Sequence, residues 1–478
     1  MTANTIEFIF NNKIYRISNP DPNETILNFI RLKLKKTGTK EGCAEGGCGA
    51  CTIVLGELVD NNIQYKAINA CIAFLTILNG KQLILVEDLI SSDGKLHPVQ
   101  NAMVKFHGSQ CGFCTPGFIM SMFAMYKNNK SFNDEIINDS LSGNLCRCTG
   151  YRPIIDAAKS LNKINDNDEF TKFKKKIINL LKKIKLKNIE INKENKKYFA
   201  PSTILELKKV LKKNPDAKLL SGGTDLSLEI TKSRKEIKKI IYLNSIKELD
   251  FIYTKKNEIE VGAGTSLLKF EKIIKKYYPD FNTILKRYGS VQIRNVGTIA
   301  GNIATASPIG DTLPILLSLD TKIILDGPKK REIIPLNKFF ISYRKTKLKK
   351  GQFIYSVKIP IYKKNIFKAY KISKRFDDDI SSVCGSFNIE INKNRIKKIR
   401  IAYGGMSEIP KRAKNAEKTL VNSIFSEKIF SKAIKNLDSD YKPIDDMRAS
   451  KSYRMEIAKN LLMKCFLEVK NKKILRLN

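Results

Sequence analysis

The sequence predicts an α+β protein of several domains. Its 478 residues exceed what one hydrophobic core commonly supports, and 42% of them are hydrophobic, which is enough to build several cores. Stretches of alternating apolar and polar residues, typical of strands, are mixed with stretches of helical spacing. No apolar run approaches the roughly 20 residues that a membrane-spanning helix needs, so we expect no membrane association.

The first predicted domain depends on the cysteines near the N-terminus. One group has the spacing C-x4-C-x2-C followed by a distant fourth cysteine, and its members are Cys43, Cys48, Cys51 and Cys71. This spacing is typical of a plant-type [2Fe-2S] ferredoxin, whereas zinc, the alternative, favours two short pairs. A loop that carries three ligands must approach the cluster closely with its amides toward the sulfurs, which small residues allow; here they are Gly42, Gly46, Gly47 and Gly49.

The surrounding pattern predicts a β-grasp ferredoxin-type domain over residues 1–88. The expected elements are a hairpin, an amphipathic helix and a strand, over residues 5–10 with 13–20, 24–36 and 51–58. Residues 67–78 then bring Cys71 back to the loop. The N-terminus alternates like a strand and does not run apolar after a basic start, so we predict no signal peptide and a cytoplasmic location, where thiols stay reduced.

A small helical bundle with a second cluster is predicted over residues 89–162. The cysteines of this region form one C-x2-C and one C-x-C pair, namely Cys111, Cys114, Cys146 and Cys148. A C-x-C pair is unusual for zinc, because it confines two thiolates to one small loop. His97 and His107 match the spacing of neither group, so both sites are predicted to be all-thiolate. Helical spacing covers residues 117–129, 134–145 and 151–161.

Residues 163–196 are rich in Lys and Asn and are predicted to form a charged, partly helical linker. The domain that follows, residues 197–361, begins with a strand, a helix capped by Ser202 or Thr203, and a buried strand that ends at Leu220. The next residues, Gly222, Gly223 and Thr224, are able to offer consecutive amides to a pyrophosphate, although an ordinary turn uses the same residues. No G-x-G-x-x-G and no G-x-x-x-x-G-K-[ST] sequence is present, so neither a Rossmann site nor a P-loop is predicted.

The formal charge of +40 raises the alternative of a basic zinc-dependent or nucleic-acid-binding protein. Lysine is spread through every segment alongside Asn and Ile, and neither a basic recognition helix nor a stacking-aromatic motif is found. A solvated lysine-rich surface is therefore favoured over nucleic-acid binding. Docking of an acidic partner subunit stays possible.

The order of the motifs C-x4-C-x2-C, CGFCTPG and CRCTGY is similar to the iron–sulfur region of the molybdenum hydroxylases, the family of xanthine dehydrogenase, aldehyde oxidase and carbon monoxide dehydrogenase. The resemblance implies that the first cysteine group binds the ferredoxin-type [2Fe-2S] cluster. It also implies that the second group binds a [2Fe-2S] cluster in the helical domain, nearer the molybdenum cofactor.

Residues 293–314, IRNVGTIAGNIATASPIGDTLP, resemble the FAD domain of the same family, which is related to the vanillyl-alcohol oxidase (PCMH-type) fold and implies a two-part α/β domain. The implied first pyrophosphate loop is Leu219, Leu220, Ser221, Gly222, Gly223, Thr224, Asp225 and Leu226. The implied second loop, with the ribose and adenine contacts, is Gly297, Thr298, Gly301, Asn302, Thr305 and Asp311. Asp311 is expected to accept from a ribose hydroxyl, and isolated contacts are implied for Tyr288, Ile354 and Lys371.

Residues 362–478 show strands followed by helices and resemble the small α+β cap domain of this family, as in the carbon monoxide dehydrogenase flavoprotein. Asp377, Asp378 and Asp379 lie on the loop where the resemblance implies that a nicotinamide docks, and a solvated loop is the alternative. Cys384 and Cys465 fit no ligand pattern and are expected to be buried free thiols.

A fused iron–sulfur and FAD chain of this length resembles the small subunits of bacterial xanthine dehydrogenases. No stretch of the sequence has the pattern of a molybdopterin-binding region, so we expect that cofactor, and every residue that oxidises substrate, on a partner subunit. The resemblance then implies that electrons pass from the partner through two [2Fe-2S] clusters to FAD and NAD+, in support of the oxidation of hypoxanthine and xanthine to urate in purine catabolism. A dimer of heterodimers is implied. The alternative within the family is a hydroxylase of aldehydes or other N-heterocycles that uses O2 or a quinone.

Overall fold

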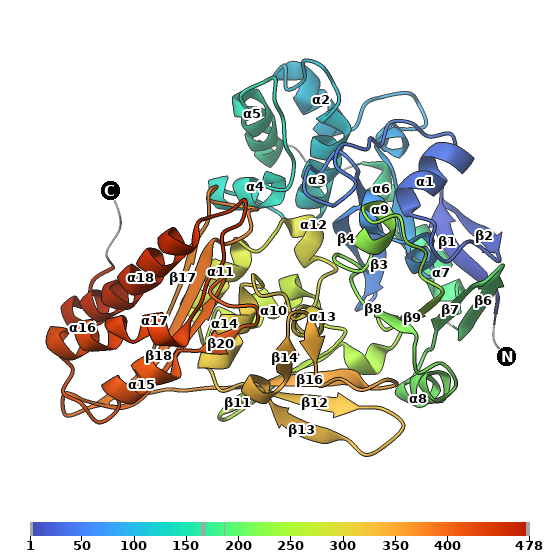
Figure 1. Ribbon diagram of the computed structural model, residues 1–478. Coiled ribbons are helices and arrows are strands. Elements are labelled where there is room, and N and C mark those ends of the chain that lie inside the picture. The colour runs from blue at the N-terminus through green and yellow to red at the C-terminus, as the bar shows by residue number, and fades with distance from the viewer. Residues whose placement is uncertain (1–2, 164–167, 186, 475–478) are drawn as a thin grey trace. The chain divides into compact units, whose positions relative to one another are not determined.

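The computed structural model describes residues 3–163, 168–185 and 187–474 (Figure 1). The chain divides into two compact units. Unit 1 comprises Met1–Lys247 and Gly289–Gly297, and unit 2 comprises Glu248–Tyr288 and Thr298–Asn478. The short segment Gly289–Gly297 therefore packs with the N-terminal half of the chain, although its neighbours in sequence belong to unit 2.

The N-terminal part of unit 1 is a five-stranded sheet with the order β2-β1-β5-β3-β4, as expected for a ferredoxin-type domain. Its strands are β1 Thr5–Phe10, β2 Lys13–Ser18, β3 Thr52–Val59, β4 Asn62–Asn69 and β5 Gln82–Ile84. The predicted hairpin forms, with Phe10 paired to Lys13 and a turn at Asn11 and Asn12, whose φ angles are 50° and 58°. Asparagine tolerates this left-handed region better than most residues, so the turn suits its sequence.

The helix predicted over residues 24–36 is much shorter in the structure. Thr25 caps a single helical turn, α1 Ile26–Asn28, and a π-helical turn follows over Phe29–Lys33. Leu34 N donates to Phe29 O at 3.0 Å, which is an i to i+5 bond, and the next residue, Lys35, has a φ of 56°. Apolar spacing predicts which residues are buried here, but it does not reveal a change in the hydrogen-bond period.

The second part of unit 1 is helical, as predicted, with α2 Pro98–Lys105, α3 Thr115–Asn128, α4 Asp134–Leu141 and α5 Arg152–Ser160. Proline stands in the first turn of α2, α3 and α5, where its missing N–H costs nothing. Ten residues of α3 are buried, including Met120, Met122 and Met125, so these methionines fill the core.

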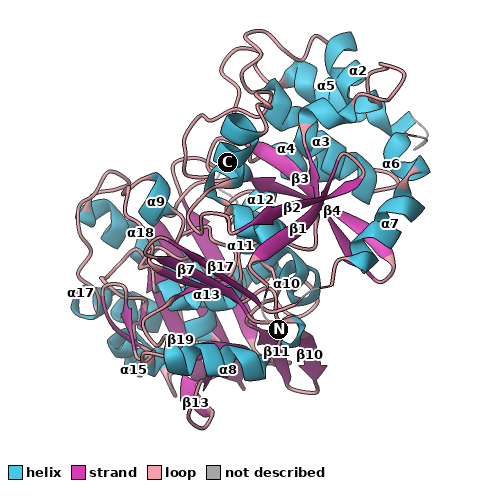
Figure 2. Ribbon diagram, turned by 90° about the vertical axis from the view of Figure 1, so that its right-hand side faces the viewer, coloured by secondary structure: helices cyan, strands magenta, loops and turns pink. Residues whose placement is uncertain are grey.

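The predicted linker is largely structured. It contains α6 Glu169–Lys172, α7 Lys174–Lys183 and the strand β6 Ile189–Lys193, while residues 164–167 and 186 lie outside the described residues. Helix α7 packs against β1 and β4 (Figure 2). The expectation of a linker to residue 196 is therefore corrected: β6 pairs with β7 Lys196–Ala200, and the next sheet starts before residue 190.

The second sheet of unit 1 has the order β6-β7-β9-β8, and its last two strands are parallel. The remaining elements of unit 1 are β8 Lys218–Leu220, β9 Lys239–Tyr242, α8 Ile204–Lys213, α9 Leu228–Thr231 and α12 Val291–Arg294. Thr203 caps α8 by accepting from Glu206 N, and β8 ends at Leu220, both as predicted. Side chains from the two sheets of unit 1 share one hydrophobic core.

Unit 2 contains the second part of the predicted FAD region and the C-terminal region. A five-stranded sheet has the order β10-β11-β16-β12-β13, with strands β10 Ile252–Lys255, β11 Glu258–Gly262, β12 Lys322–Asp326, β13 Glu332–Pro335 and β16 Phe353–Pro360. A small pair adds β14 Phe340–Ser342 and β15 Lys345–Thr346. The helices are α10 Leu267–Ile274, α11 Pro279–Lys286, α13 Ile299–Thr305 and α14 Thr312–Ser318.

The C-terminal region is a four-stranded sheet followed by helices, as the sequence predicts. The strands are β17 Ile366–Ile372, β18 Val383–Asn392, β19 Arg395–Gly404 and β20 Lys411–Arg412. The helices α15 Lys414–Leu420, α16 Glu427–Lys435, α17 Leu437–Asp440 and α18 Lys451–Asn471 gather on one side of these strands (Figure 1). Among the described residues, no helix is long and apolar enough to cross a membrane.

Helix α6 is fastened to the helical domain by buried charges. His97 Nε2 lies 2.8 Å from Asp168 Oδ2, and Lys127 Nζ lies 3.0 Å from Asp168 Oδ1. Val99 N donates to His97 Nδ1, so His97 donates from Nε2. Burial alone raises the pKa of Asp168, but the hydrogen bond from His97 and the charge of Lys127 outweigh it and hold that pKa well below its usual value.

We therefore expect Asp168→Asn to loosen α6 and α7 at neutral pH, at a cost of about 3 kcal/mol, because it removes a buried carboxylate that contacts both His97 and Lys127. Amide hydrogen exchange in residues 168–183 should become faster. Because the folded-state pKa is depressed, wild-type attachment is complete above about pH 4 and weakens below it. Asp134→Asn, which breaks the exposed pair with Lys159, is the control and should leave exchange unchanged. Wild-type exchange rates in the Asp168 variant would contradict this assignment.

Candidate iron–sulfur and flavin sites

The first cysteine group converges in unit 1. Cys51 Sγ lies 3.2 Å from Cys71 Sγ, and Cys43 contacts both Cys48 and Cys71. The hydrogen bonds from Cys48 and Cys71 hold the pKa of the Cys43 thiol well below its ordinary value, and the bond to Cys43 raises the pKa of Cys48. Glu45 N points at Cys43 Sγ at 3.5 Å, as expected of a cluster-binding loop.

Glycine allows the ligand loop to adopt this path. Gly46 and Gly49 have φ angles of +80° and +70°, and a Cβ at Gly49 would lie 2.2 Å from Gly143 O. A Cβ at Gly42 would lie 2.8 Å from Cys48 Sγ. Gly47 differs, because a Cβ there meets nothing within 4 Å and its φ is not positive. The sequence-based requirement for small residues therefore holds at three of the four glycines.

The second cysteine group forms two contacting pairs, Cys114 with Cys146 and Cys111 with Cys148. Burial, with the bond to Cys146, raises the pKa of Cys114 to about 12. Burial opposes ionisation of Cys146 as well, but hydrogen bonds from Thr149 and nearby amides lower its pKa to about 7. Cys146 N donates to the hydroxyl of Tyr151, at 3.0 Å. Cys111 and Cys148 are exposed, so this site opens to the surface of unit 1.

The number and type of the ligand atoms indicate which metal group the thiols fit. Among the described residues, no three or more His, Cys, Asp or Glu side chains form a group suited to a metal ion. In the first group Cys43 and Cys71 each contact two other thiols, and in the second group the thiols form two contacting pairs. Each group supplies four thiolates, and two thiolates on each of two irons is the ligand count of a [2Fe-2S] cluster. An all-sulfur donor set with amides directed at sulfur also fits this cluster. Both groups therefore fit [2Fe-2S] clusters better than single zinc ions.

The two ligand loops are in direct contact. Leu145 N donates to Cys48 O at 3.0 Å, which joins a neighbour of Cys146 to a ligand of the first group. Asn144 Nδ2 donates to Gly49 O at 3.1 Å. A Cβ at Gly117 would lie 2.2 Å from Gly49 O, so α3 also approaches the first loop without a side chain between them.

The first predicted pyrophosphate loop lies in unit 1, after β8. A Cβ at Gly222 would lie 2.2 Å from Val296 O and 2.7 Å from Gly297 N, so the loop runs directly against the start of the second predicted loop. Gly223 has a φ of +74°. Ser221 Oγ bonds to Asn244 Oδ1 at 2.5 Å. Glycine is thus required here for close backbone approach, which is what a phosphate-binding loop needs.

Unit 2 brings several other predicted FAD residues together. Thr298 Oγ1 caps α13 by accepting from Gly301 N at 2.9 Å. Asn302 Nδ2 donates to the hydroxyl of Tyr288 at 2.8 Å, and Asn302 Oδ1 accepts from Thr312. Thr305 is the last residue of α13. Ile354 stands apart from these residues, because it lies on β16 and packs in the hydrophobic core of the unit.

Asp311 and Lys371 form a buried ion pair of 2.8 Å in unit 2, with side-chain exposures of 4% and 1%. The other oxygen of Asp311 accepts from Ser381, and Lys371 also donates to Arg287 O at 2.7 Å. Each carboxylate oxygen is therefore already bonded within the protein. A carboxylate that is this buried requires its own counter-charge, which Lys371 supplies. Each oxygen retains capacity for a further hydrogen bond, so the expected contact with a ribose hydroxyl stays a prediction.

The loop around the predicted nicotinamide site carries an exposed aromatic side chain. Phe376 is 73% exposed, and the guanidinium of Arg287 lies 4.3 Å from its ring centroid. Asp377 is exposed, and Asp379 accepts from Arg375 N. Cys384 and Cys465 are buried free thiols, as predicted.

Sequence reasoning did not identify the residues of α12 and its flanks, which follow Tyr288. Arg294, fully buried, pairs with Asp139 in α4 at 2.5 Å. Asn295 Nδ2 donates to Ala67 O in β4 at 2.8 Å, and Gln292 contacts three buried side chains. The only available signal was three polar residues within the sequence QIRN, shortly before the second glycine loop.

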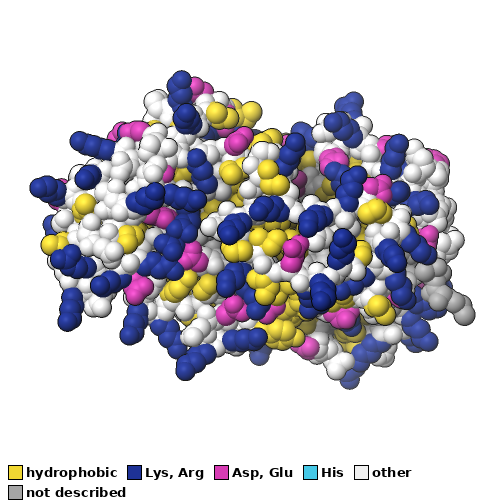
Figure 3. Space-filling view, turned by 60° about the horizontal axis from the view of Figure 1, so that its bottom comes forward, with side chains coloured by type: hydrophobic (Ala, Val, Ile, Leu, Met, Phe, Trp, Pro, Cys, Tyr) yellow, Lys and Arg dark blue, Asp and Glu magenta, His cyan; other side chains and the backbone are white. Residues whose placement is uncertain are grey.

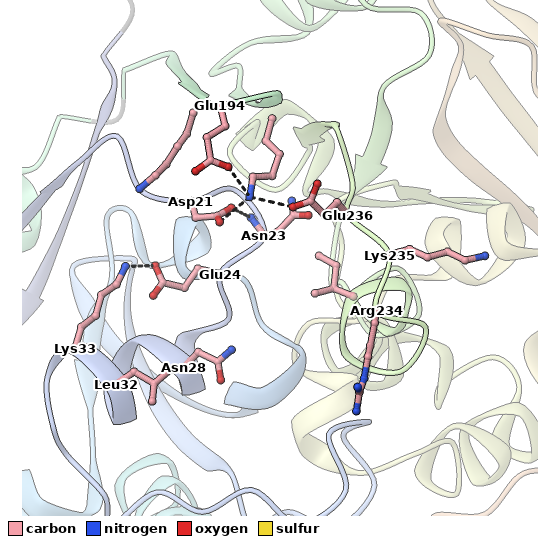
Figure 4. A pocket seen from close by; sticks show the side chains of 13 residues that line it. Asp21, Asn23, Glu24, Asn28, Leu32, Lys33, Glu194, Arg234, Lys235 and Glu236 are labelled. Atoms are coloured by element: carbon pink, nitrogen blue, oxygen red, sulfur yellow. Dashed lines mark hydrogen bonds and ion pairs between the residues drawn. The ribbon is translucent and has the colours of Figure 1, made fainter.

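A cavity of about 520 Å³ in unit 1 is lined mainly by charged side chains (Figure 4). Lys196 Nζ lies 2.8 Å from Asp21 and 3.5 Å from Glu236, and Lys33 pairs with Glu24 at 2.7 Å. None of the predicted cluster ligands or FAD residues lines it. These charged side chains pair with one another across the contact between β7 and the N-terminal domain. We therefore interpret the cavity as part of that contact and do not assign it a ligand.

Four families match consecutive parts of the chain. Residues 9–76 match the 2Fe-2S iron-sulfur cluster binding domain, and residues 85–159 match the [2Fe-2S] binding domain. Residues 189–362 match the FAD binding domain in molybdopterin dehydrogenase, and residues 368–469 match the CO dehydrogenase flavoprotein C-terminal domain. The second match begins directly after β5 and the third begins at β6. The third match spans parts of both units.

The chain is 32% identical to xanthine dehydrogenase of Emericella nidulans over 88% of its own length and 35% of that protein. It is 33% identical to xanthine dehydrogenase of Blastobotrys adeninivorans over 88% of the chain and 37% of that protein. It thus spans about a third of these relatives. Carbon monoxide dehydrogenase of Hydrogenophaga pseudoflava shares the fold, with a TM-score of 0.54 and 23% identity over 57% of this chain and 96% of that chain.

Two [2Fe-2S]-binding domains followed by an FAD-binding domain and its C-terminal partner define an iron–sulfur flavoprotein. The order of these domains and the similarity to xanthine dehydrogenases narrow this class further. The chain belongs to the molybdenum hydroxylase family and carries its electron-transfer and FAD part.

The close approach at Gly49 generates a prediction with an internal control. Gly49→Ala should prevent assembly of the first cluster, because its Cβ overlaps Gly143 O and its φ disfavours alanine. Gly47→Ala, in the same loop, should assemble normally, because its Cβ meets open space. Iron and labile sulfide per chain, with visible absorption, measure assembly. Equal iron content in the two variants would show that the loop tolerates a side chain at Gly49.

Proposed function

We propose that the chain is the small subunit of a xanthine dehydrogenase, partnered by a molybdopterin-binding large subunit and using NAD+ as acceptor. Hypoxanthine and xanthine would be oxidised to urate on the partner, and this chain would conduct the electrons away. The observation that carries the proposal is that two groups of four thiols lie in one compact unit with the first predicted phosphate loop. The similarity of 30% or more to proteins named xanthine dehydrogenase supports the choice of substrate.

The chemistry that the bound groups supply is one-electron transfer by the clusters and the exchange of two electrons at the flavin. Cys43, Cys48, Cys51 and Cys71 would hold one cluster, and Cys111, Cys114, Cys146 and Cys148 would hold the other. The chain itself sets the environment of these thiolates. Glu45 N and Asn69 Nδ2 point at sulfurs of the first group, while exposed Cys111 and Cys148 place the second group at the surface of unit 1.

For the flavin, we propose that Leu219, Leu220, Ser221, Gly222, Gly223, Thr224, Asp225, Leu226 and Gly297 bind the diphosphate from unit 1. The closeness of Gly222 to Val296 and Gly297 supports this assignment. In unit 2, the candidates are Tyr288, Thr298, Gly301, Asn302, Thr305, Asp311, Ile354 and Lys371. The Asp311 carboxylate would act there mainly by orienting Lys371.

The proposed cofactors are tested on anaerobically purified chain. Reduction with dithionite should give electron paramagnetic resonance (EPR) signals from two distinct binuclear clusters. Chemical analysis should find about four iron atoms, about four labile sulfides and one FAD per chain. A colourless preparation with two zinc ions would reverse the assignment. The charge-based alternative has little support, because Lys and Arg are scattered among Asp and Glu on the face in Figure 3.

The substrate is tested on the complex with its partner. Xanthine should reduce NAD+ to NADH faster than aldehydes or other N-heterocycles do, with little transfer to O2 or quinone. A faster reaction with an aldehyde, or transfer to O2 alone, would identify a sister hydroxylase.

Cys114→Ser or Cys146→Ser tests the path through the second group. Either change removes one thiolate from the pair that these two residues form. We expect FAD to stay bound and NADH formation from xanthine to fall to background. Cys465→Ser, which alters a buried thiol in unit 2, is the control and should turn over normally. Normal turnover in both ligand variants would contradict the path.

A further inference from the structure

The side chain of Gln292 stands at the point where the two ligand loops of unit 1 meet. It is 0% exposed. Its Nε2 lies 3.1 Å from Ser121 Oγ, 3.1 Å from Asn144 Oδ1 and 3.3 Å from Thr52 Oγ1. Ser121 lies on α3, Thr52 on β3 and Asn144 in the loop after α4, so one amide group connects three other segments of the chain to its own.

Each partner of Gln292 is tied to a cluster ligand. Thr52 follows Cys51 directly, and its hydroxyl donates to Gly49 O at 2.6 Å. Asn144 lies two residues before Cys146 and also donates to Gly49 O. Ser121 lies on α3, whose N-cap is Cys114. The network therefore contacts the backbone of the first loop and both ends of the second ligand set.

The segment that carries Gln292 is fixed on both sides. Arg294 pairs with Asp139 of the helical domain, and Asn295 donates to Ala67 O of the ferredoxin-type domain. A Cβ at Gly143 would lie 2.4 Å from Gln292 Oε1, so the backbone beside Asn144 packs directly on the amide. Buried hydrogen bonds are directional, so the three contacts of Gln292 Nε2 favour one arrangement of the segments that they join.

We propose that Gln292 is a positioning residue that holds the two cluster-binding loops at a fixed separation and orientation. The proposal rests on the proposed electron-transfer function, since it concerns the same two ligand groups. Ser121 and Asn144 contact each other without the glutamine, at 2.7 Å. What Gln292 adds is a link from a segment 171 residues from Ser121 and 240 residues from Thr52. Its loss should therefore change the geometry between the clusters and leave their ligands in place.

Gln292→Met tests this role, because methionine keeps the length of the side chain and removes its donor. In the full chain with its clusters and FAD, we expect unchanged iron content and a changed magnetic interaction between the two dithionite-reduced clusters in the EPR spectrum. Electron equilibration between the clusters, followed after pulse radiolysis, should slow by roughly tenfold, within the 100-fold that a misplacement of 1 Å can cost at a reaction centre. Ser121→Ala should change the magnetic interaction and slow electron equilibration in the same way. In the double variant, the slowing should be smaller than the two single-variant effects combined.

Gln82→Met is the matched control, because Gln82 is also buried in unit 1, on β5, but its side chain makes no hydrogen bond to either ligand loop among the described residues. This control should leave the EPR signals of both clusters and the rate of electron equilibration between them unchanged. Wild-type coupling and rate in Gln292→Met would overturn the proposal. Loss of clusters from Gln292→Met with unaltered coupling in Ser121→Ala would also overturn it, since the glutamine would then be purely structural. Absence of two binuclear signals in the wild-type chain is a failure of the proposed function, and it is seen before any variant is made.

Discussion

The structure of unit 1 depends on the close approach of the backbone segments that carry its eight thiols. Sulfur atoms on separate loops reach contact distance only if the backbones that carry them also come very close. Gly49, Gly117 and Gly143 meet this requirement, since a Cβ at any of them would overlap a neighbouring atom. The hydrogen bond from Leu145 N to Cys48 O is possible for the same reason. The two domains are thus joined through their ligand loops, and the ligand geometry also determines the packing of the domains.

Buried polar groups hold together segments that are distant in sequence. The pairs Arg294 with Asp139, His97 with Asp168, and Lys371 with Asp311 each join separate elements within one unit. A buried charge is costly unless it is paired, so each pair favours one arrangement over the alternatives. The large positive net charge of the chain does not come from these buried pairs. Most lysines are exposed, and the face in Figure 3 shows them dispersed.

The sequence predicted the parts of the structure that local spacing determines. The cysteine intervals, the hairpin at residues 5–18 and the cap at Thr203 are local features, and each is found as expected. Features that depend on distant contacts were missed. The π-turn at Phe29–Lys33 and the ordered linker differ from prediction because packing decided their form. The same holds at the site: the convergence of the thiols followed from spacing, but the engagement of Asp311 by Lys371 requires the folded sheet.

The assignment of Gly289–Gly297 to unit 1 has a consequence for electron transfer. This segment lies within the FAD-binding match, yet its side chains are anchored in both cluster-binding domains. The end of this segment, at Val296 and Gly297, packs directly against Gly222. A Cβ at the next residue, Gly223, would lie 3.4 Å from the carbonyl oxygen of Ile72, which follows the predicted ligand Cys71. The first ligand loop and the first proposed diphosphate loop therefore share one compact unit. Electron transfer needs a constant separation between donor and acceptor, and contacts within unit 1 hold the first ligand loop and the first proposed diphosphate loop together.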